Sequence, residues 1–133
     1  MRIYGLIGKN LSHSSSVRYF NEKFLKEEIT NTRYKNFELK NISEFPKLIK
    51  ENNISGLNIT IPFKESIIPF LDKVSDAVKE IRAVNTIKNI NGKLFGFNTD
   101  ILGFEKSIYP LLQNKKTALI LGNGGASKSI QYV

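Results

Sequence analysis

Residues 56–61, Gly-Leu-Asn-Ile-Thr-Ile, carry the clearest strand pattern of the chain. Their aliphatic side chains alternate with Asn58 and Thr60, and successive side chains of a strand point to opposite faces of a sheet. Pro62 follows directly and cannot donate a ladder hydrogen bond, so we expect the strand to end there. The stretch therefore predicts a strand with one apolar face and one polar face.

A hairpin is predicted on the C-terminal side of this strand. Strand-like runs at 83–90 and 93–98 are joined by Asn91-Gly92. Asn-Gly readily adopts the positive backbone angles of a two-residue turn and is the strongest short hairpin signal. Hairpin strands are antiparallel, so the sheet that contains them is mixed rather than purely parallel.

Strand-like and helix-like patterns alternate over the rest of the chain. The expected strands cover residues 2–7, 33–39, 56–61, 83–90, 93–98 and 116–121. One expected helix covers the run from 64 to 71. The others begin at the capping serines at 14–16 and 43, and at residues 75, 99–100 and 122–127. This alternation predicts an α/β architecture.

The composition of the 133 residues excludes several function classes. The chain has no cysteine and a single histidine, His13, which excludes disulfides, thiol nucleophiles, thiolate metal sites and a histidine-rich metal centre. No apolar run approaches the roughly 18 residues that span a bilayer, and the N-terminus lacks the apolar core of a secretory signal. We therefore expect a globular cytoplasmic protein with neither a metal site nor a membrane segment.

The formal net charge of +8 raises the question of nucleic-acid binding. The basic residues are spread over the chain, and in stretches such as 21–28 lysines are interleaved with glutamates. That pattern is typical of solvated helix faces rather than of a phosphate-binding patch. We expect no nucleic-acid partner.

A glycine cluster at 122–127, Gly-Asn-Gly-Gly-Ala-Ser, follows the expected strand at 116–121 and opens a helix. Such a turn brings the backbone and helix N–H groups close to the pyrophosphate of a dinucleotide. Ser127 stands where the usual third glycine would be, so a tight strand-to-helix turn without a ligand remains an equal alternative. An isolated βα unit cannot bury both faces of its strand, so we expect residues 115–133 to open a second domain.

Small polar residues elsewhere have two interpretations as well. The hydroxyls at 14–16 stand at an expected helix N-terminus, where they could bind a carboxylate or phosphate or serve only as caps. The polar face of the strand at 56–61 could face a ligand or solvent, and Lys64 could be an ordinary solvated lysine. Turn and cap roles equally explain the polar residues at 85–86 and 98–100.

Five motifs, in this order, resemble those of the shikimate dehydrogenase family. His13-Ser14-Ser15-Ser16 resembles the family's H-S-x-S loop, and residues 56–64 resemble its G-x-N-[IV]-T-x-P-x-K. Residues 83–86 resemble A-V-N-T, residues 96–103 resemble G-x-N-T-D-x-x-G, and residues 122–127 are similar to G-x-G-G-A-S. Together the motifs span almost the whole chain, so their order is more specific than any one of them.

The resemblance implies a three-layer αβα catalytic domain with a mixed, mostly parallel sheet over residues 1–100, then a linking helix at 101–114. Residues 115–133 would be the truncated first βα unit of an NADP-binding Rossmann domain. The sequence departs from the family pattern at Asn10 and Val17, where prolines are usual. Arg82 stands where a glycine commonly precedes A-V-N-T. Because of the departures at Asn10 and Val17, the resemblance does not determine the shape of the serine loop.

The resemblance also implies an activity, the NADPH-dependent reduction of 3-dehydroshikimate to shikimate in aromatic amino acid biosynthesis. It assigns catalysis to Lys64 and Asp100. The substrate-binding residues that it implies are Ser14, Ser16, Asn58, Thr60, Lys64, Asn85 and Asp100. The cofactor-binding residues that it implies are Gly122, Asn123, Gly124, Gly125, Ala126 and Ser127.

Two alternatives are open at this point. The chain by itself could be a substrate-binding fragment without dehydrogenase activity, and the enzyme could be a relative that oxidises quinate or prefers NAD. In each case the expected partner is a small molecule. Apolar residues after Leu112, including those at 118–121, favour self-association and leave a homodimer open.

Overall fold

A mixed six-stranded sheet organises the 133 residues, all of which the computed structural model describes. The strands are β1 (Arg2–Gly8), β2 (Thr32–Glu38), β3 (Ile54–Ile59), β4 (Lys73–Val74), β5 (Thr86–Ile90) and β6 (Lys93–Phe97), in the order β2-β1-β3-β5-β6-β4. β1 pairs in parallel with β2 and β3, β4 pairs in parallel with β6, and only β5 runs against its neighbours. The predicted mixed, mostly parallel sheet is confirmed.

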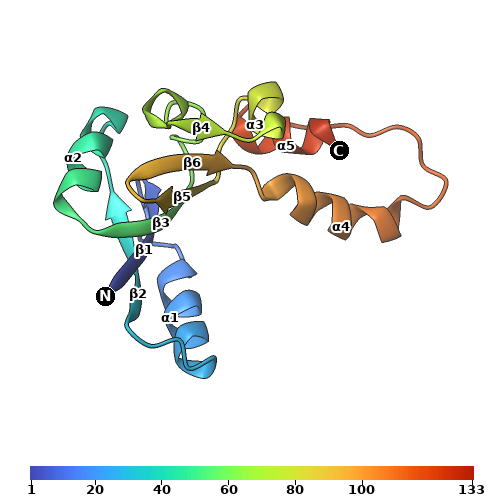
Figure 1. Cartoon of the computed structure of the whole chain (residues 1–133). Coiled ribbons are helices and arrows are strands. Elements are labelled where there is room, and N and C mark those ends of the chain that lie inside the picture. The colour runs from blue at the N-terminus through green and yellow to red at the C-terminus, as the bar shows by residue number, and fades with distance from the viewer.

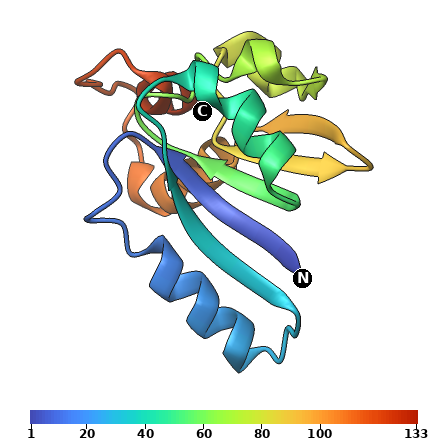
Figure 2. The same ribbon diagram turned by 90° about the vertical axis from the view of Figure 1, so that its left-hand side faces the viewer.

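Helices lie on both faces of the sheet and complete three layers, as Figures 1 and 2 show. The helices are α1 (Ser16–Lys26), α2 (Phe45–Glu51), α3 (Asp76–Ile81), α4 (Asp100–Leu112) and α5 (Gly125–Tyr132), with 3-10 turns η1 (Ile42–Glu44) and η2 (Ile68–Phe70). α1 packs on one face, along β1 and β2, and α2 packs on the opposite face. None of the helices has the length and apolar character that crossing a membrane requires.

Successive side chains of a strand point to opposite faces of the sheet, and the apolar ones form two clusters, one on each face. In β1, Ile7 belongs to the larger cluster on the α2 side, whereas its neighbour Leu6 belongs to the smaller cluster under α1. The larger cluster consists of Ile7, Leu39, Phe45, Ile54, Leu57, Ile59, Phe63, Ile67, Val78, Val84, Ile87 and Leu94. The smaller cluster is Leu6, Leu11 and Tyr34, with Val17, Phe20 and Phe24 of α1 packed against it. The core therefore lies mainly on the α2 side of the sheet.

The prediction of a strand at 116–121 is wrong. The segment belongs to no strand of the sheet, and Leu119 and Leu121 are 84% and 88% exposed. A strand needs neighbours to pair its backbone groups and to cover its apolar face, and nothing in this chain supplies them to these residues. Apolar strand propensity alone does not produce a strand here.

Two local predictions also need correction. The helix expected at 64–71 is replaced by turns and η2, because Pro69 lies inside the run and proline removes a hydrogen bond from a helix interior. Ser43 is not the cap before α2. Asn41 caps the preceding η1 by accepting a hydrogen bond from the Ser43 N–H at 3.0 Å, and the Glu44 side chain completes the capping box.

The polar motifs converge on one edge of the sheet. β1, β3 and β6 end at this edge, and β5, which runs the opposite way, begins there. The segments that follow or precede these strand ends hold the serine loop, Lys64, Asn85 and Asp100. In α/β sheets, ligands bind outside the carboxyl ends of the parallel strands, and the candidate site lies at that edge.

Candidate functional site

An ion pair between Lys64 and Asp100 is the centre of the candidate site. Lys64 Nζ lies 2.6 Å from Asp100 Oδ2, and the two side chains are 15% and 38% exposed. The backbone of Lys64 is fixed as well, because its carbonyl accepts a hydrogen bond from Val84 N at 2.8 Å. Partial burial strengthens such a pair, since less water screens it. The geometry holds the Lys64 ammonium in one place at the sheet edge.

Asn85 holds the second oxygen of the Asp100 carboxylate. Its Nδ2 donates to Asp100 Oδ1 at 2.7 Å, and its own Oδ1 accepts from the backbone N–H of Thr99 at 2.9 Å. A backbone N–H can only donate, so the bond from Thr99 decides which end of the amide faces the carboxylate. Both carboxylate oxygens are thus occupied by donors from this chain.

The beginning of α4 also favours the Asp100 carboxylate. Asp100 is the first residue of the helix, where the positive end of the helix dipole stabilises a negative charge. The cap expected from Thr99-Asp100 is off by one residue, because Thr99 makes no side-chain cap bond. Instead, Asn98 Oδ1 accepts from the N–H groups of Asp100 and Ile101, at 3.0 and 3.3 Å.

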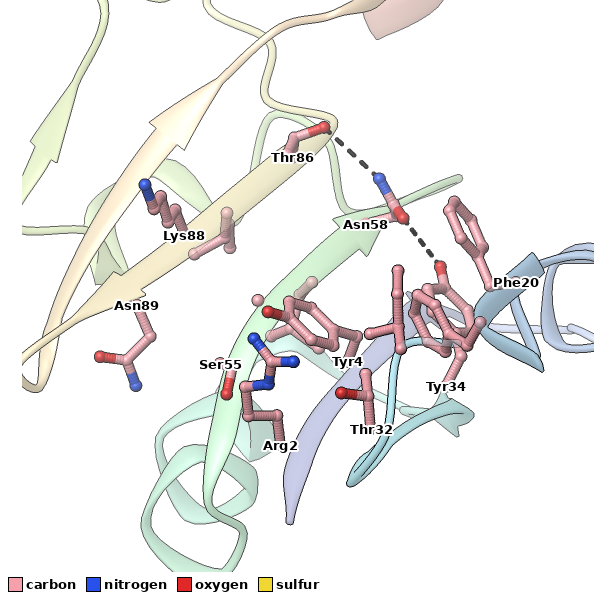
Figure 3. A pocket seen from close by; sticks show the side chains of 15 residues that line it. Arg2, Tyr4, Phe20, Thr32, Tyr34, Ser55, Asn58, Thr86, Lys88 and Asn89 are labelled. Carbon is pink, nitrogen blue, oxygen red and sulfur yellow. Dashed lines mark hydrogen bonds between the residues drawn. The ribbon is translucent and has the colours of Figure 1, made fainter. Parts of the chain in front are cut away.

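Asn58 extends the hydrogen bonds toward α1, as Figure 3 shows. Its Oδ1 accepts from the Tyr34 hydroxyl at 2.8 Å, and its Nδ2 donates to Thr86 Oγ1 at 3.4 Å. Thr86 Oγ1 in turn donates to Asn85 Oδ1 at 2.9 Å. A continuous series of hydrogen bonds therefore runs from Tyr34 through Asn58, Thr86 and Asn85 to the ion pair. We call it the Tyr34–Asp100 network.

Ser14, Ser16 and Thr60 lie at the same sheet edge but outside the network. The Ser14 hydroxyl accepts from the Ser16 N–H at 3.2 Å, where α1 begins. Thr60 flanks the serine loop, because its N–H donates to the Ile7 carbonyl at 2.9 Å and a Cβ on Gly8 would stand 2.7 Å from its methyl group. The first turn of α1 has no acidic side chain, which suits its N-terminus to an anion.

The glycine cluster forms the turn before α5 and the beginning of that helix, which packs against Lys64. Gly122 has a φ of +135°, which favours glycine, and a Cβ on Gly125 would stand 3.0 Å from Lys64 Cβ. Ser129 Oγ accepts from Asn98 Nδ2 at 2.9 Å and ties the helix to the start of α4. The first turn of α5 carries no acidic side chain. The residues therefore fit a pyrophosphate at this helix N-terminus, beside Lys64.

A cavity of about 530 Å³ opens on the α1 side of the sheet. Asn58 and Thr86 line one end of it, next to Tyr34, as Figure 3 shows. Lys64 and Asp100 are not among its lining residues. The cavity thus meets only one end of the Tyr34–Asp100 network, and we place the candidate site at the sheet edge, where the charged groups converge.

Sequence reasoning missed Tyr34 as a site residue and left Thr86 without a role. Thr86 belongs to the A-V-N-T motif, so a signal for it was present. Tyr34 belongs to no motif, and it reaches Asn58 only because β2 and β3 flank β1 in the sheet. Knowledge of the strand order is needed to find it.

The chain is similar to a known protein family and to curated proteins. The family described as the shikimate dehydrogenase substrate binding domain matches residues 6–87. The NADP(+) shikimate dehydrogenase of Aquifex aeolicus (strain VF5) is 43% identical over 136 residues, covering 98% of this chain and 50% of that protein. The chain spans about half the length of the curated relatives it matches.

Solved structures agree with these sequence matches. Shikimate dehydrogenase 1 from Peptoclostridium difficile has a TM-score of 0.88 and 39% identity, covering 99% of this chain and 50% of that one. Shikimate 5-dehydrogenase from Thermus thermophilus, solved with NADP(H) and shikimate, has a TM-score of 0.84 and 32% identity, covering 98% of this chain and 50% of that one. The likeness extends over 98–99% of the chain.

Proposed function

The chain belongs to the shikimate dehydrogenase family, and from this premise we propose that it is the substrate-binding half of an enzyme that reduces 3-dehydroshikimate to shikimate. The observation that carries the proposal is the Lys64–Asp100 ion pair, with both carboxylate oxygens held and the ammonium 2.6 Å from one of them. That arrangement offers a fixed proton donor at the edge where the family motifs meet. By itself the 133-residue chain is proposed to bind substrate without turning it over.

The proposed chemistry needs a hydride and a proton. NADPH, when bound, would supply the hydride to the ketone carbon of the substrate. Lys64 Nζ donates the proton to the ketone oxygen as negative charge develops there. The π bond of the carbonyl and one N–H bond of Lys64 break, a C–H bond and an O–H bond form, and the C–O single bond remains. The Asp100 carboxylate holds the ammonium in position and stabilises its charge, and Lys64 recovers its proton from water.

The proposed substrate contacts follow the chemistry of the groups at the sheet edge. The hydroxyls of Ser14 and Ser16, with Thr60 beside them, bind the substrate carboxylate at the N-terminus of α1. Asn58, Asn85 and Asp100 bind the ring hydroxyls. This division is supported by the hydrogen-bond inventory, since amide and carboxylate groups can pair with hydroxyls as donor and acceptor.

The proposed cofactor contacts lie in residues 122–127, where the N–H groups of the first turn of α5 would hold the pyrophosphate. We further propose that residues 1–100 form the catalytic domain, that residues 101–114 link it, and that residues 115–133 begin the nucleotide-binding domain. Self-association through the apolar residues after Leu112, including those at 118–121, stays a prediction, and so does a cytoplasmic location.

The proposal is tested with a chimera in which residues 1–133 replace the matching half of the Aquifex aeolicus enzyme. We expect shikimate-dependent formation of NADPH by the chimera and none by the 133-residue chain alone, with the parent enzyme as the positive control. Faster turnover of quinate, or of NAD, would favour the corresponding alternative. A folded chimera whose NADPH formation does not depend on shikimate would contradict the proposal.

A further inference from the structure

We propose that Tyr34 is a positioning residue for substrate binding, which it serves by fixing the side-chain amide of Asn58. The inference rests on the proposed function and adds to it a residue that makes no contact with Lys64 or Asp100 itself. It starts from the bond between the Tyr34 hydroxyl and Asn58 Oδ1, which is 2.8 Å long. The two residues come from different strands, β2 and β3, with β1 between them.

The ring of Tyr34 is held rigidly enough to direct its hydroxyl. The residue is only 3% exposed, and its ring stacks on Phe20 of α1 with centroids 4.5 Å apart and an interplanar angle of 16°. Its backbone is held by Asn21, which accepts from Tyr34 N and donates to Tyr34 O, both at 3.0 Å. The hydroxyl therefore has little freedom to leave Asn58.

The two hydroxyl neighbours of Asn58 together set how it presents its amide. Thr86 gives its hydrogen to Asn85 and can only accept from Asn58, so Nδ2 faces Thr86 and Oδ1 faces the Tyr34 hydroxyl, from which it accepts. Thr86 Oγ1 donates its own hydrogen to Asn85 Oδ1 and accepts from Asn58 Nδ2 at 3.4 Å. That distance marks a weak bond, so Asn58 Nδ2 keeps donor capacity for a ligand hydroxyl.

The same residue also connects the two halves of the proposed substrate site. Phe20 and Asn21 lie in α1, whose first turn follows Ser14, and both contact Tyr34. Burial raises the pKa of Tyr34, so the phenol remains protonated and can donate over the whole working range of an enzyme. Tyr34 thus ties the serine loop helix on one side to Asn58 on the other.

The test is a double-mutant cycle on shikimate binding by the 133-residue chain, using Tyr34→Phe, Asn58→Ala and the double variant. Tyr34→Phe keeps the stacked ring and removes only the hydroxyl, so we expect the dissociation constant to rise about threefold to tenfold. Because Tyr34 acts through Asn58, we expect the double variant to bind as weakly as Asn58→Ala and no more weakly. If Tyr34 served only the stability of the fold, the double variant would instead bind shikimate more weakly than Asn58→Ala. Tyr109→Phe, at a residue that is 76% exposed, is the matched control.

The outcomes separate this inference from the proposed function. Wild-type affinity in Tyr34→Phe, or losses that multiply in the double variant, would overturn the positioning role while leaving the shikimate site in place. Wild-type affinity in Asn58→Ala would overturn the assignment of Asn58 to the substrate, and the inference with it. Thermal unfolding of each variant verifies that it is folded at the temperature of the titration.

Discussion

Lys64→Ala is expected to lower the kcat of the chimera by orders of magnitude, roughly 10²-fold to 10⁴-fold, with little change in the dissociation constant of shikimate. The variant removes the proton donor that faces the developing alkoxide. No other ammonium is paired with Asp100, so no side chain takes over the role. Binding is less affected because the carboxylate and most hydroxyls of the substrate are assigned to other residues. Single-turnover rates and a separate binding titration distinguish the two quantities.

The matched control for this variant is Lys79→Ala. Lys79 also forms a lysine–aspartate pair, with Asp76 at 2.7 Å, but its side chain is 65% exposed and lies in α3, away from the proposed substrate contacts. We expect this control to keep the parental kcat, since exposed ion pairs contribute little. A Lys64→Ala chimera with near-parental turnover would remove Lys64 from the mechanism.

Asp100→Asn is expected to have the second-largest effect, a fall in kcat of roughly 10²-fold or more together with weaker shikimate binding. The substitution keeps the shape of the side chain but removes its charge. It leaves the Lys64 ammonium, which is 15% exposed, without its partner and free to move away from the substrate. With aspartate at this position, Lys64 Nζ and Asn85 Nδ2 each donate to a carboxylate oxygen. In the variant, the new side-chain NH₂ group faces one of these two donors in place of an acceptor.

Asp76→Asn controls for the loss of an aspartate in a lysine pair. The neighbouring Lys79 lowers the pKa of Asp76, but the carboxylate is on the surface and its loss should leave both kcat and affinity unchanged. If Asp100→Asn behaved like this control, the ion pair would be a structural feature rather than part of the reaction.

The fold is predictable from sequence wherever the determinant is local or periodic. Asn91-Gly92 predicts the hairpin correctly, and both residues have the positive φ angles, 52° and 83°, that the turn requires. The strand at 116–121 fails for the opposite reason. Its apolar pattern is present, but pairing depends on neighbours that a local pattern cannot reveal. The strand expected at 56–61 lies two residues earlier, as Ile54–Ile59, because its ends depend on pairing with β1 and β5.

The candidate site is predictable only in part. The motifs identify Lys64, Asn85 and Asp100, and the structure joins them by hydrogen bonds of 2.6 and 2.7 Å. The same motifs do not show that a backbone N–H of Thr99 orients Asn85, because that contact depends on how β6 leads into α4. The role of Tyr34 cannot be predicted from the motifs for a related reason, since the strand order that brings it to Asn58 follows from long-range parallel pairing.

The most direct test of the account is a titration of the ¹⁵N-labelled 133-residue chain with shikimate, followed by NMR. We predict shifts that saturate at roughly millimolar ligand or below, at the backbone amides of Ser14, Thr60 and Asn85. These three come from separate loops that meet at one sheet edge, so joint shifts would place the ligand there. Absence of shifts at millimolar shikimate, or shifts confined to cavity residues such as Arg2 and Lys88, would contradict the account.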